Sequence, residues 1–112
     1  MMVVTTIDVF GLTEEEYGRV MNRLGVEAQA ASGIFLHISA QTEVGYRVTE
    51  IWDSEDGFRA FLADRLGPAA EAERIEREMK ITVEPLHNFF GPRLSELPAS
   101  IPSLPGSPAN RN

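Results

Sequence analysis

The chain has no cysteine, few basic residues and no long apolar run. Disulfides are therefore excluded, and their absence favours a reducing compartment. The 10 Lys and Arg are outnumbered by 17 Asp and Glu, giving a net charge of −7. Such a chain repels nucleic acid and anionic lipid, so we expect neither as a partner. The apolar runs are shorter than the ~18 residues of a membrane span, and no basic segment precedes an apolar one at the N-terminus. We therefore expect a cytoplasmic protein.

The 112 residues suffice for one domain. Five of the seven prolines come after residue 90, among serines and small residues without helical or strand periodicity. This composition predicts a Pro/Ser-rich tail at residues 91–112 and a folding unit at residues 1–90. A domain of this size hides only about 60% of its unfolded surface, so it gains little stability alone.

The N-terminal part predicts a strand followed by a helix. Residues Met2–Phe10 are rich in β-branched side chains, which favour a strand. Thr13 and Glu16 then have the spacing of a capping box, in which each side chain accepts a free backbone N–H at the helix start. An apolar stripe at helical spacing follows, and Gly25 is a typical helix stop. The stripe consists of Tyr17, Val20, Met21 and Leu24.

A hairpin is predicted next, from Gly33–Ser39 and Tyr46–Trp52, because the connection between these two strands is short. Strict alternation puts Ile34, Leu36 and Ile38 on one face of the first strand, and Phe35, His37 and Ser39 on the other. In the second strand, one face carries Tyr46, Val48, Glu50 and Trp52.

The C-terminal half predicts further helix and a last strand. Asp53 or Ser54 caps a helix with Phe58, Phe61, Leu62 and Leu66 inward, and Gly67-Pro68 interrupts it. A charged helical piece is expected at 69–79, and a strand at Ile81–Phe90. Pro85 lacks an N–H for the ladder, so this strand should lie at an edge or contain a bulge.

The resulting order, β-α-β-β-α-β, predicts an α+β, ferredoxin-like fold with a four-stranded antiparallel sheet. The helices can cover only one face of that sheet, yet both faces carry large apolar residues. An exposed apolar face of this kind indicates an interface. We therefore expect a homodimer that packs sheet against sheet, with the tail folding over the sheet as the alternative.

With this element order, the chain resembles the dimeric α/β-barrel superfamily, in particular its antibiotic-biosynthesis-monooxygenase-like branch. The block EIWDSEDGF at residues 50–58 is similar to that family's acidic–x–aromatic–x–Ser–x–x–small–Phe run, and VEPLHN at 83–88 is similar to its closing strand. The resemblance implies two protomers forming a barrel, each with a pocket between its sheet and helices.

Members of that superfamily oxidise polycyclic phenols without a cofactor, cyclise polyketides, degrade haem or have no known activity. Many oxidising members carry a histidine on the second helix, nine residues after the strand aromatic. That position is Phe61 here, and no histidine occurs between Trp52 and Lys80. Haem ligation by the family's usual route is therefore not expected, and we predict neither a cofactor nor a metal.

Three residues are candidates for acid–base catalysis. His37 and His87 are the only histidines, and a neutral imidazole can act as a general base. Either could instead be a structural histidine bound to a neighbour. Glu50 lies between two aromatic residues, where desolvation would raise its pKa. It could act as an acid or base, or pair with Arg47 or another arginine.

Four residues are candidates for substrate binding. Tyr46 and Trp52 share a strand face on which a flat ligand could stack, although both rings could simply fill the core. Asn88 could bind a carbonyl or oxyanion, or cap a strand end. Phe61 occupies the position of the family's helix histidine.

Two functions are consistent with these residues. The first is a cofactor-independent enzyme, of monooxygenase or cyclase type, in which a base ionises a hydrophobic aromatic or polyketide-like metabolite. The second is a non-catalytic dimeric ligand-binding or structural module, which the missing helix histidine favours. A pocket reached by a histidine or Glu50 would favour the enzyme. The tail could also be a docking peptide, because spaced prolines favour the extended conformation that partner grooves bind.

Overall fold

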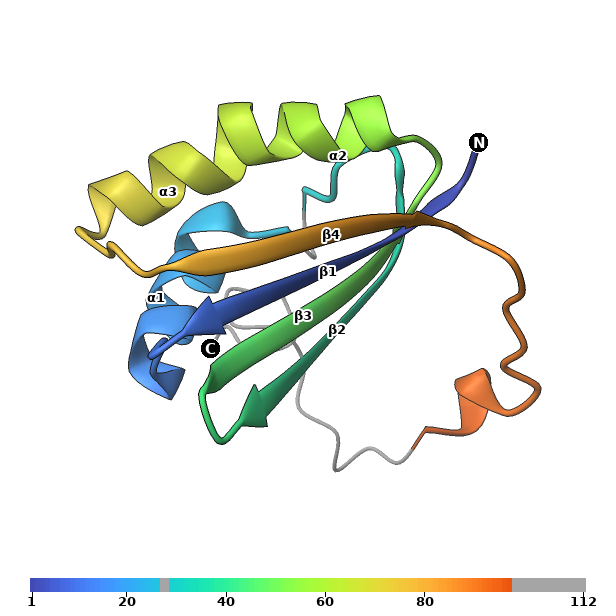
Figure 1. Cartoon of the computed structure of the whole chain (residues 1–112), viewed down its shortest axis with the longest axis horizontal. Coiled ribbons are helices and arrows are strands. Elements are labelled where there is room, and N and C mark those ends of the chain that lie inside the picture. The colour runs from blue at the N-terminus through green and yellow to red at the C-terminus, as the bar shows by residue number, and fades with distance from the viewer. Residues whose placement is uncertain (27–28, 98–112) are drawn as a thin grey trace.

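The computed structural model describes residues 1–26 and 29–97. Four strands form one antiparallel sheet in the order β2-β3-β1-β4, and the helices pack on one side of it (Figure 1). This arrangement confirms the predicted ferredoxin-like fold. Most of the predicted tail lies outside the described residues. The strands are β1 (Val3–Phe10), β2 (Ile34–Thr42), β3 (Gly45–Trp52) and β4 (Met79–Pro85).

The first helix, α1 (Glu14–Leu24), begins at the predicted capping box. The Thr13 hydroxyl accepts the Glu16 N–H at 3.1 Å, and Glu16 Oε1 accepts the Thr13 N–H at 3.1 Å. The same carboxylate binds Arg77, with Nε at 3.1 Å from Oε1, so the cap also anchors the segment before β4. The helix ends at Gly25, whose φ of 56° is left-handed as expected for a helix-terminating glycine.

The second helical segment starts at Ser54, whose side chain accepts the Gly57 N–H at 3.1 Å. The predicted break at Gly67-Pro68 does not occur. Instead α2 (Glu55–Phe61) continues through a π-helical turn, η1 (Leu62–Leu66), into α3 (Gly67–Ala72). Pro68 lies in the first turn of α3, directly after the π-helical turn, where the hydrogen-bond spacing of the helix changes. The proline is therefore compatible with a continuous helical segment.

The predicted charged helix at 69–79 ends early, at Ala72. Arg74 has a positive φ of 57°, and the chain turns there toward the sheet. β4 begins at Met79, two residues before the predicted start, and stops at Pro85 rather than Phe90. The charged residues after Ala72 offer too little apolar surface to hold a helix against the core. Pro85 ends an edge strand, which agrees with the expectation from its missing N–H.

A β-bulge in β2 changes which residues face the helices. The pairing with β3 shifts between Ile34 and Leu36, so that Ile34 lies opposite Trp52 while His37 lies opposite Glu50. Strict alternation would place Ile34 and His37 on opposite faces of the sheet. Because the bulge adds one residue, both face the helices instead.

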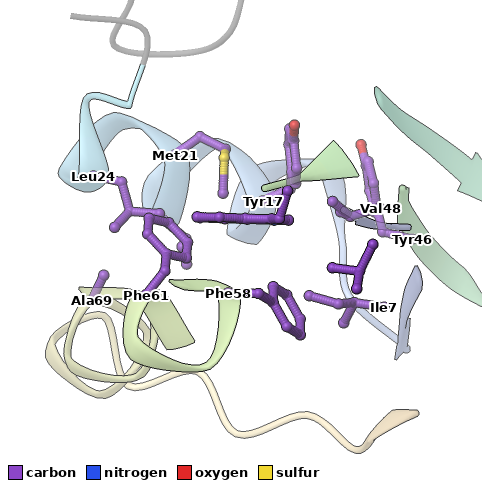
Figure 2. Close-up of a cluster of buried hydrophobic side chains, with 12 residues drawn as sticks. Ile7, Tyr17, Met21, Leu24, Tyr46, Val48, Phe58, Phe61 and Ala69 are labelled. Carbon is purple, nitrogen blue, oxygen red and sulfur yellow. The ribbon is translucent and has the colours of Figure 1, made fainter. Parts of the chain in front are cut away.

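The core lies between the sheet and the helices (Figure 2). Trp52 and Phe58 are almost completely buried, at 1% and 0% exposure. The Trp52 ring contacts the Phe58 ring edge-on, with centroids 5.9 Å apart, and the Phe61 ring at 5.4 Å. The aromatic residues at the end of β3 and on α2 therefore join the helix to the sheet.

None of the helices α1, α2 and α3 in the described part of the chain lies over the opposite face of the sheet (Figure 1). Ile38 is 52% exposed and Phe10 is 37% exposed on this outer face, whereas Ile51, in the inner strand β3, is buried. Asp8 and Arg47, opposite each other on β1 and β3, form an ion pair at 2.7 Å there. The outer face is thus partly apolar, and the expected sheet-to-sheet dimer stays a prediction.

Replacing Thr5 by valine should stabilise the protein. Thr5 is 0% exposed and its hydroxyl has no hydrogen-bond partner among the described residues. An unpaired buried hydroxyl carries a desolvation penalty that valine removes, so Thr5→Val should raise the free energy of unfolding by about 1 kcal/mol. Thr6→Val, on the half-buried outer face, is the control for strand propensity. A loss of stability in urea unfolding for Thr5→Val alone would contradict this reading.

The Glu16 cap should make stability pH-dependent. Desolvation acts to raise the pKa of Glu16, but the Thr13 N–H and the Arg77 guanidinium outweigh it and lower the pKa below 4.5. A lowered folded-state pKa stabilises the fold above the unfolded-state value, and that stabilisation is lost as the pH falls through the folded pKa. Thermal unfolding should therefore show Glu16→Gln destabilised at pH 7, with the difference shrinking below pH 4.5. Glu15→Gln, in the same helical turn but with a side chain 83% exposed, should show less effect at either pH.

Candidate functional site

Four polar side chains form a continuous hydrogen-bonded chain beneath α1. Trp52 Nε1 donates to Glu50 Oε1 at 3.0 Å. Glu50 Oε2 lies 2.7 Å from His37 Nδ1, and His37 Nε2 lies 3.0 Å from the Tyr17 hydroxyl. The residues come from α1, β2 and β3, so three elements must fold together before the chain exists.

The Glu50 carboxylate sets the protonation of this chain. Its residue is only 5% exposed, and its two oxygens meet the Trp52 N–H and a ring nitrogen of His37. A carboxylate held this way keeps the proton of a neutral His37 on Nδ1. Nε2 of His37 is then an acceptor, and the Tyr17 hydroxyl donates to it.

A cavity of about 640 Å³ lies between the sheet and the helices, next to this chain. Among the described residues that line it, Tyr17, His37 and Glu50 are three of the four polar ones. The fourth, Arg77, is already paired with Glu16, at 3.0 Å. The rest of the lining is aliphatic, aromatic or glycine, and includes Ile7, Val20, Met21, Leu24, Val48, Phe61, Leu66 and Ile81. The cavity thus has the volume and the largely apolar character of a small-molecule site.

Tyr46 and Trp52 have their ring faces against other aromatic rings. The Tyr46 ring stacks on Tyr17, with centroids 4.8 Å apart and planes 4° from parallel (Figure 2). Trp52 packs against Phe58 and Phe61, and lines a second, smaller hollow of about 430 Å³. Both rings therefore fill the core, which was the alternative to ligand stacking considered from the sequence. Contact of either ring with a substrate stays a prediction.

The two tyrosines remain protonated at neutral pH. Burial raises the pKa of Tyr17, Tyr46 and Glu50 add to this electrostatically, and a hydrogen bond with Ser39 acts in the opposite direction. Burial also raises the pKa of Tyr46, with a contribution from Glu14. Both hydroxyls can therefore donate hydrogen bonds.

The other predicted site residues are divided between the cavity and the surface. Phe61 lines both hollows. His87 and Asn88 are exposed beyond the end of β4, and neither belongs to the described lining of the cavity. Arg47 pairs with Asp8 and not with Glu50. The structure therefore brings together His37, Glu50 and Phe61, while the roles predicted for His87 and Asn88 stay predictions.

Sequence reasoning missed Tyr17 as a site residue. Its position in the apolar stripe of α1 predicted burial, which the structure confirms at 8% exposure. Its contact with His37 spans 20 positions of the sequence and depends on the β2 bulge. A tyrosine in an otherwise aliphatic stripe was the one available signal, because a buried hydroxyl needs a partner.

Two absences concern the described residues only. Within 1–26 and 29–97, no three His, Asp or Glu residues are grouped so that they could bind a metal ion. In the same part of the chain, no helix has the length and hydropathy needed to cross a bilayer.

Comparison with known proteins finds relatives by structure alone. No protein-family model matches the chain, and no curated protein does. SnoaB, a cofactor-independent oxygenase from Streptomyces nogalater, superposes with a TM-score of 0.56 at 20% identity, covering 79% of this chain and 93% of SnoaB. The chain shares its fold with the antibiotic-biosynthesis-monooxygenase-like proteins.

Two further structures have the same fold. One, from Deinococcus radiodurans, is described as a candidate antibiotic biosynthesis monooxygenase, with TM-score 0.55, 20% identity and coverage of 81% and 97%. The other, NE2512 from Nitrosomonas europaea, has no known function, with TM-score 0.57, 15% identity and coverage of 80% and 94%. The resemblance found from sequence is thus confirmed as a fold, and the fold is shared by proteins with and without a described activity.

The protonation of His37 can be read by nitrogen NMR. In its neutral form, the ring should carry its proton on Nδ1, because Glu50 Oε2 accepts it at 2.7 Å. His87, which is exposed, supplies an internal reference in the same spectrum. Glu50→Gln should weaken the preference for Nδ1 at His37 and leave His87 unchanged. An Nε2-protonated His37 in the unmodified protein would show that the hydrogen-bond directions are reversed.

Proposed function

We propose that this protein is a cofactor-independent enzyme, of monooxygenase or cyclase type, that ionises a hydrophobic aromatic or polyketide-like metabolite. His37 is the base that finally holds the substrate proton. Glu50 orients its ring and stabilises the imidazolium that forms. The product of this step is a phenolate or enolate held in the cavity.

One observation supports this proposal most directly. The His37–Glu50 pair, at 2.7 Å, lies in the wall of a cavity whose remaining lining is almost entirely apolar. A hydrophobic substrate would partition from water into this cavity. Its acidic hydroxyl group would then lie against the polar part of the wall, at the His37–Glu50 pair. The fold shared with a cofactor-independent oxygenase adds support from an independent source.

The enolate can react further in two ways. O2 can oxidise an activated ring methylene to a carbonyl, with one oxygen atom entering the product and the other leaving as water. Alternatively, the carbanion form attacks a carbonyl of the same molecule and closes a ring in an aldol reaction, which consumes no oxidant. Ionisation by His37 is common to both, so the site residues are the same for either reaction.

We also propose that the protein acts as a homodimer, with the outer faces of two sheets together. The helices of residues 1–26 and 29–97 pack on the other face and leave this one uncovered (Figure 1). Exposed Ile38 and Phe10 lie on it, beside half-buried Val4 and Leu36. A second copy of the same surface would remove these side chains from water and close the two sheets into a barrel.

The second candidate is a ligand-binding module without catalysis. The observation that favours it is the presence of Phe61 in the cavity wall, where oxidising members of the resembled superfamily carry a histidine. Such a module would bind the same flat hydrophobic compounds and release them unchanged.

Oxygen uptake distinguishes the two functions. With 1,8-dihydroxyanthrone, a flat tricyclic phenol, as probe, the protein should accelerate O2 consumption over buffer. His37→Gln should lower kcat by about 100-fold or more, the lower range for a general base. The matched control is His87→Gln at the exposed second histidine, which should retain full activity. Binding of the probe without acceleration would favour the binding module.

The dimer can be tested separately from the chemistry. Ile38→Glu places a charge on the outer face of β2 and should convert a dimer into a monomer in sedimentation velocity. Val44→Glu, at the 59% exposed turn of the hairpin, is the control and should leave the dimer intact. A monomeric, folded parent protein at micromolar concentration would rule the dimer out.

A further inference from the structure

Both ring nitrogens of His37 are occupied before any substrate arrives. Glu50 Oε2 lies 2.7 Å from Nδ1 and the Tyr17 hydroxyl lies 3.0 Å from Nε2. A substrate hydroxyl in the cavity therefore cannot reach a free lone pair of the imidazole unless Tyr17 moves.

Tyr17 has little freedom to move. Its ring is stacked on Tyr46 at 4.8 Å, nearly parallel, and the residue is 8% exposed (Figure 2). Tyr17 also follows the capping box of α1 directly, where Thr13 O accepts its N–H at 2.9 Å. Both its ring and its backbone are thus held, and a side-chain rearrangement would disrupt the aromatic stack.

The Tyr17 hydroxyl is suited to transfer a proton. As a donor to His37 Nε2 it uses its single hydrogen, and its oxygen, beside the Ser39 hydroxyl, still has a second lone pair to accept another. Tyr17 lines the cavity, so a bound hydroxyl can approach this oxygen. A residue that holds a proton to give and a lone pair to accept one can pass a proton through without becoming charged.

We propose that Tyr17 is a catalytic residue that relays the substrate proton to His37; this deepens the function proposed above and depends on it. The substrate O–H bond breaks as its proton passes to the Tyr17 oxygen. The Tyr17 O–H bond breaks at the same time, and its proton goes to His37 Nε2. The substrate becomes an anion, His37 becomes an imidazolium facing Glu50, and Tyr17 ends neutral.

The surrounding groups are consistent with this relay. Among the described residues, the ionisable groups that contact His37 are Tyr17 on α1 and Glu50 on β3, and the Tyr46 ring stacks on Tyr17. Glu50, at 5% exposure, supplies the negative charge that stabilises the imidazolium. Burial raises the pKa of Tyr17, so its hydroxyl carries the proton that the relay needs at neutral pH.

Tyr17→Phe tests the relay, because it keeps the stacked ring and removes only the hydroxyl. With 1,8-dihydroxyanthrone, kcat should fall by about 100-fold with KM within about threefold of the parent value. Thr5→Val, which also removes a buried hydroxyl but lies outside the described lining of the cavity, should retain activity. The dependence of kcat on the D2O fraction of the solvent should indicate that two protons move in the rate-limiting step of the parent protein. For the residual activity of Tyr17→Phe it should indicate only one.

Failure of the relay and failure of the enzyme are distinguishable. If His37→Gln is inactive while Tyr17→Phe keeps activity within threefold, His37 takes the proton directly, and the relay is wrong although the function stands. If the parent protein is inactive, the relay can still be tested by a binding measurement that needs no turnover. The probe is 7-hydroxycoumarin, whose absorbance changes on ionisation. The parent protein should bind it as the anion at pH 7 and Tyr17→Phe as the neutral phenol. Equal ionisation in both proteins, or none in the parent, would overturn the relay.

Discussion

A carboxylate removed from water dominates the interior of this protein. Glu50 is buried on the helix-facing side of a central strand, and an unpaired charge there would be strongly destabilising. Its oxygens are met by the Trp52 N–H and by His37. These partners come from the end of the same strand and from the neighbouring edge strand, so satisfying one charge determines how β2 and β3 must pair. The same requirement orients an imidazole toward a tyrosine at the cavity wall.

The bulge in β2 is the local feature that makes this possible. One extra residue near Phe35 lets Ile34 pack beside Trp52 and still brings His37 opposite Glu50. Without the bulge, a strand in which Ile34 faces the core would turn His37 to the outer face. Bulges that re-aim a side chain are frequent next to functional sites, because they change one position and leave the rest of the ladder intact.

Much of the fold followed from local chemistry in the sequence. The capping box at Thr13, the stop at Gly25 and the cap at Ser54 each involve residues within four positions. The first two were predicted, and the third was one of two predicted alternatives, with Asp53. The end of the helical segment at Ala72 was not predicted. The charged residues that follow are compatible with a helix or with a loop, and only packing against the core decides between them. His37, Glu50 and Phe61 were selected as site residues, but Tyr17 was not. The Tyr17–His37 contact depends on a register shift that alternation cannot reveal.

The single tryptophan has a bearing beyond packing. Trp52 is 1% exposed, and its indole N–H is bound to the carboxylate that orients the imidazole. The chain contains no other indole. Fluorescence excited at the red edge of the absorption band therefore comes from one buried chromophore, hydrogen-bonded to Glu50. Trp52 is thus an intrinsic fluorophore one hydrogen bond away from Glu50, and its emission should respond to the charge of that carboxylate without any added label.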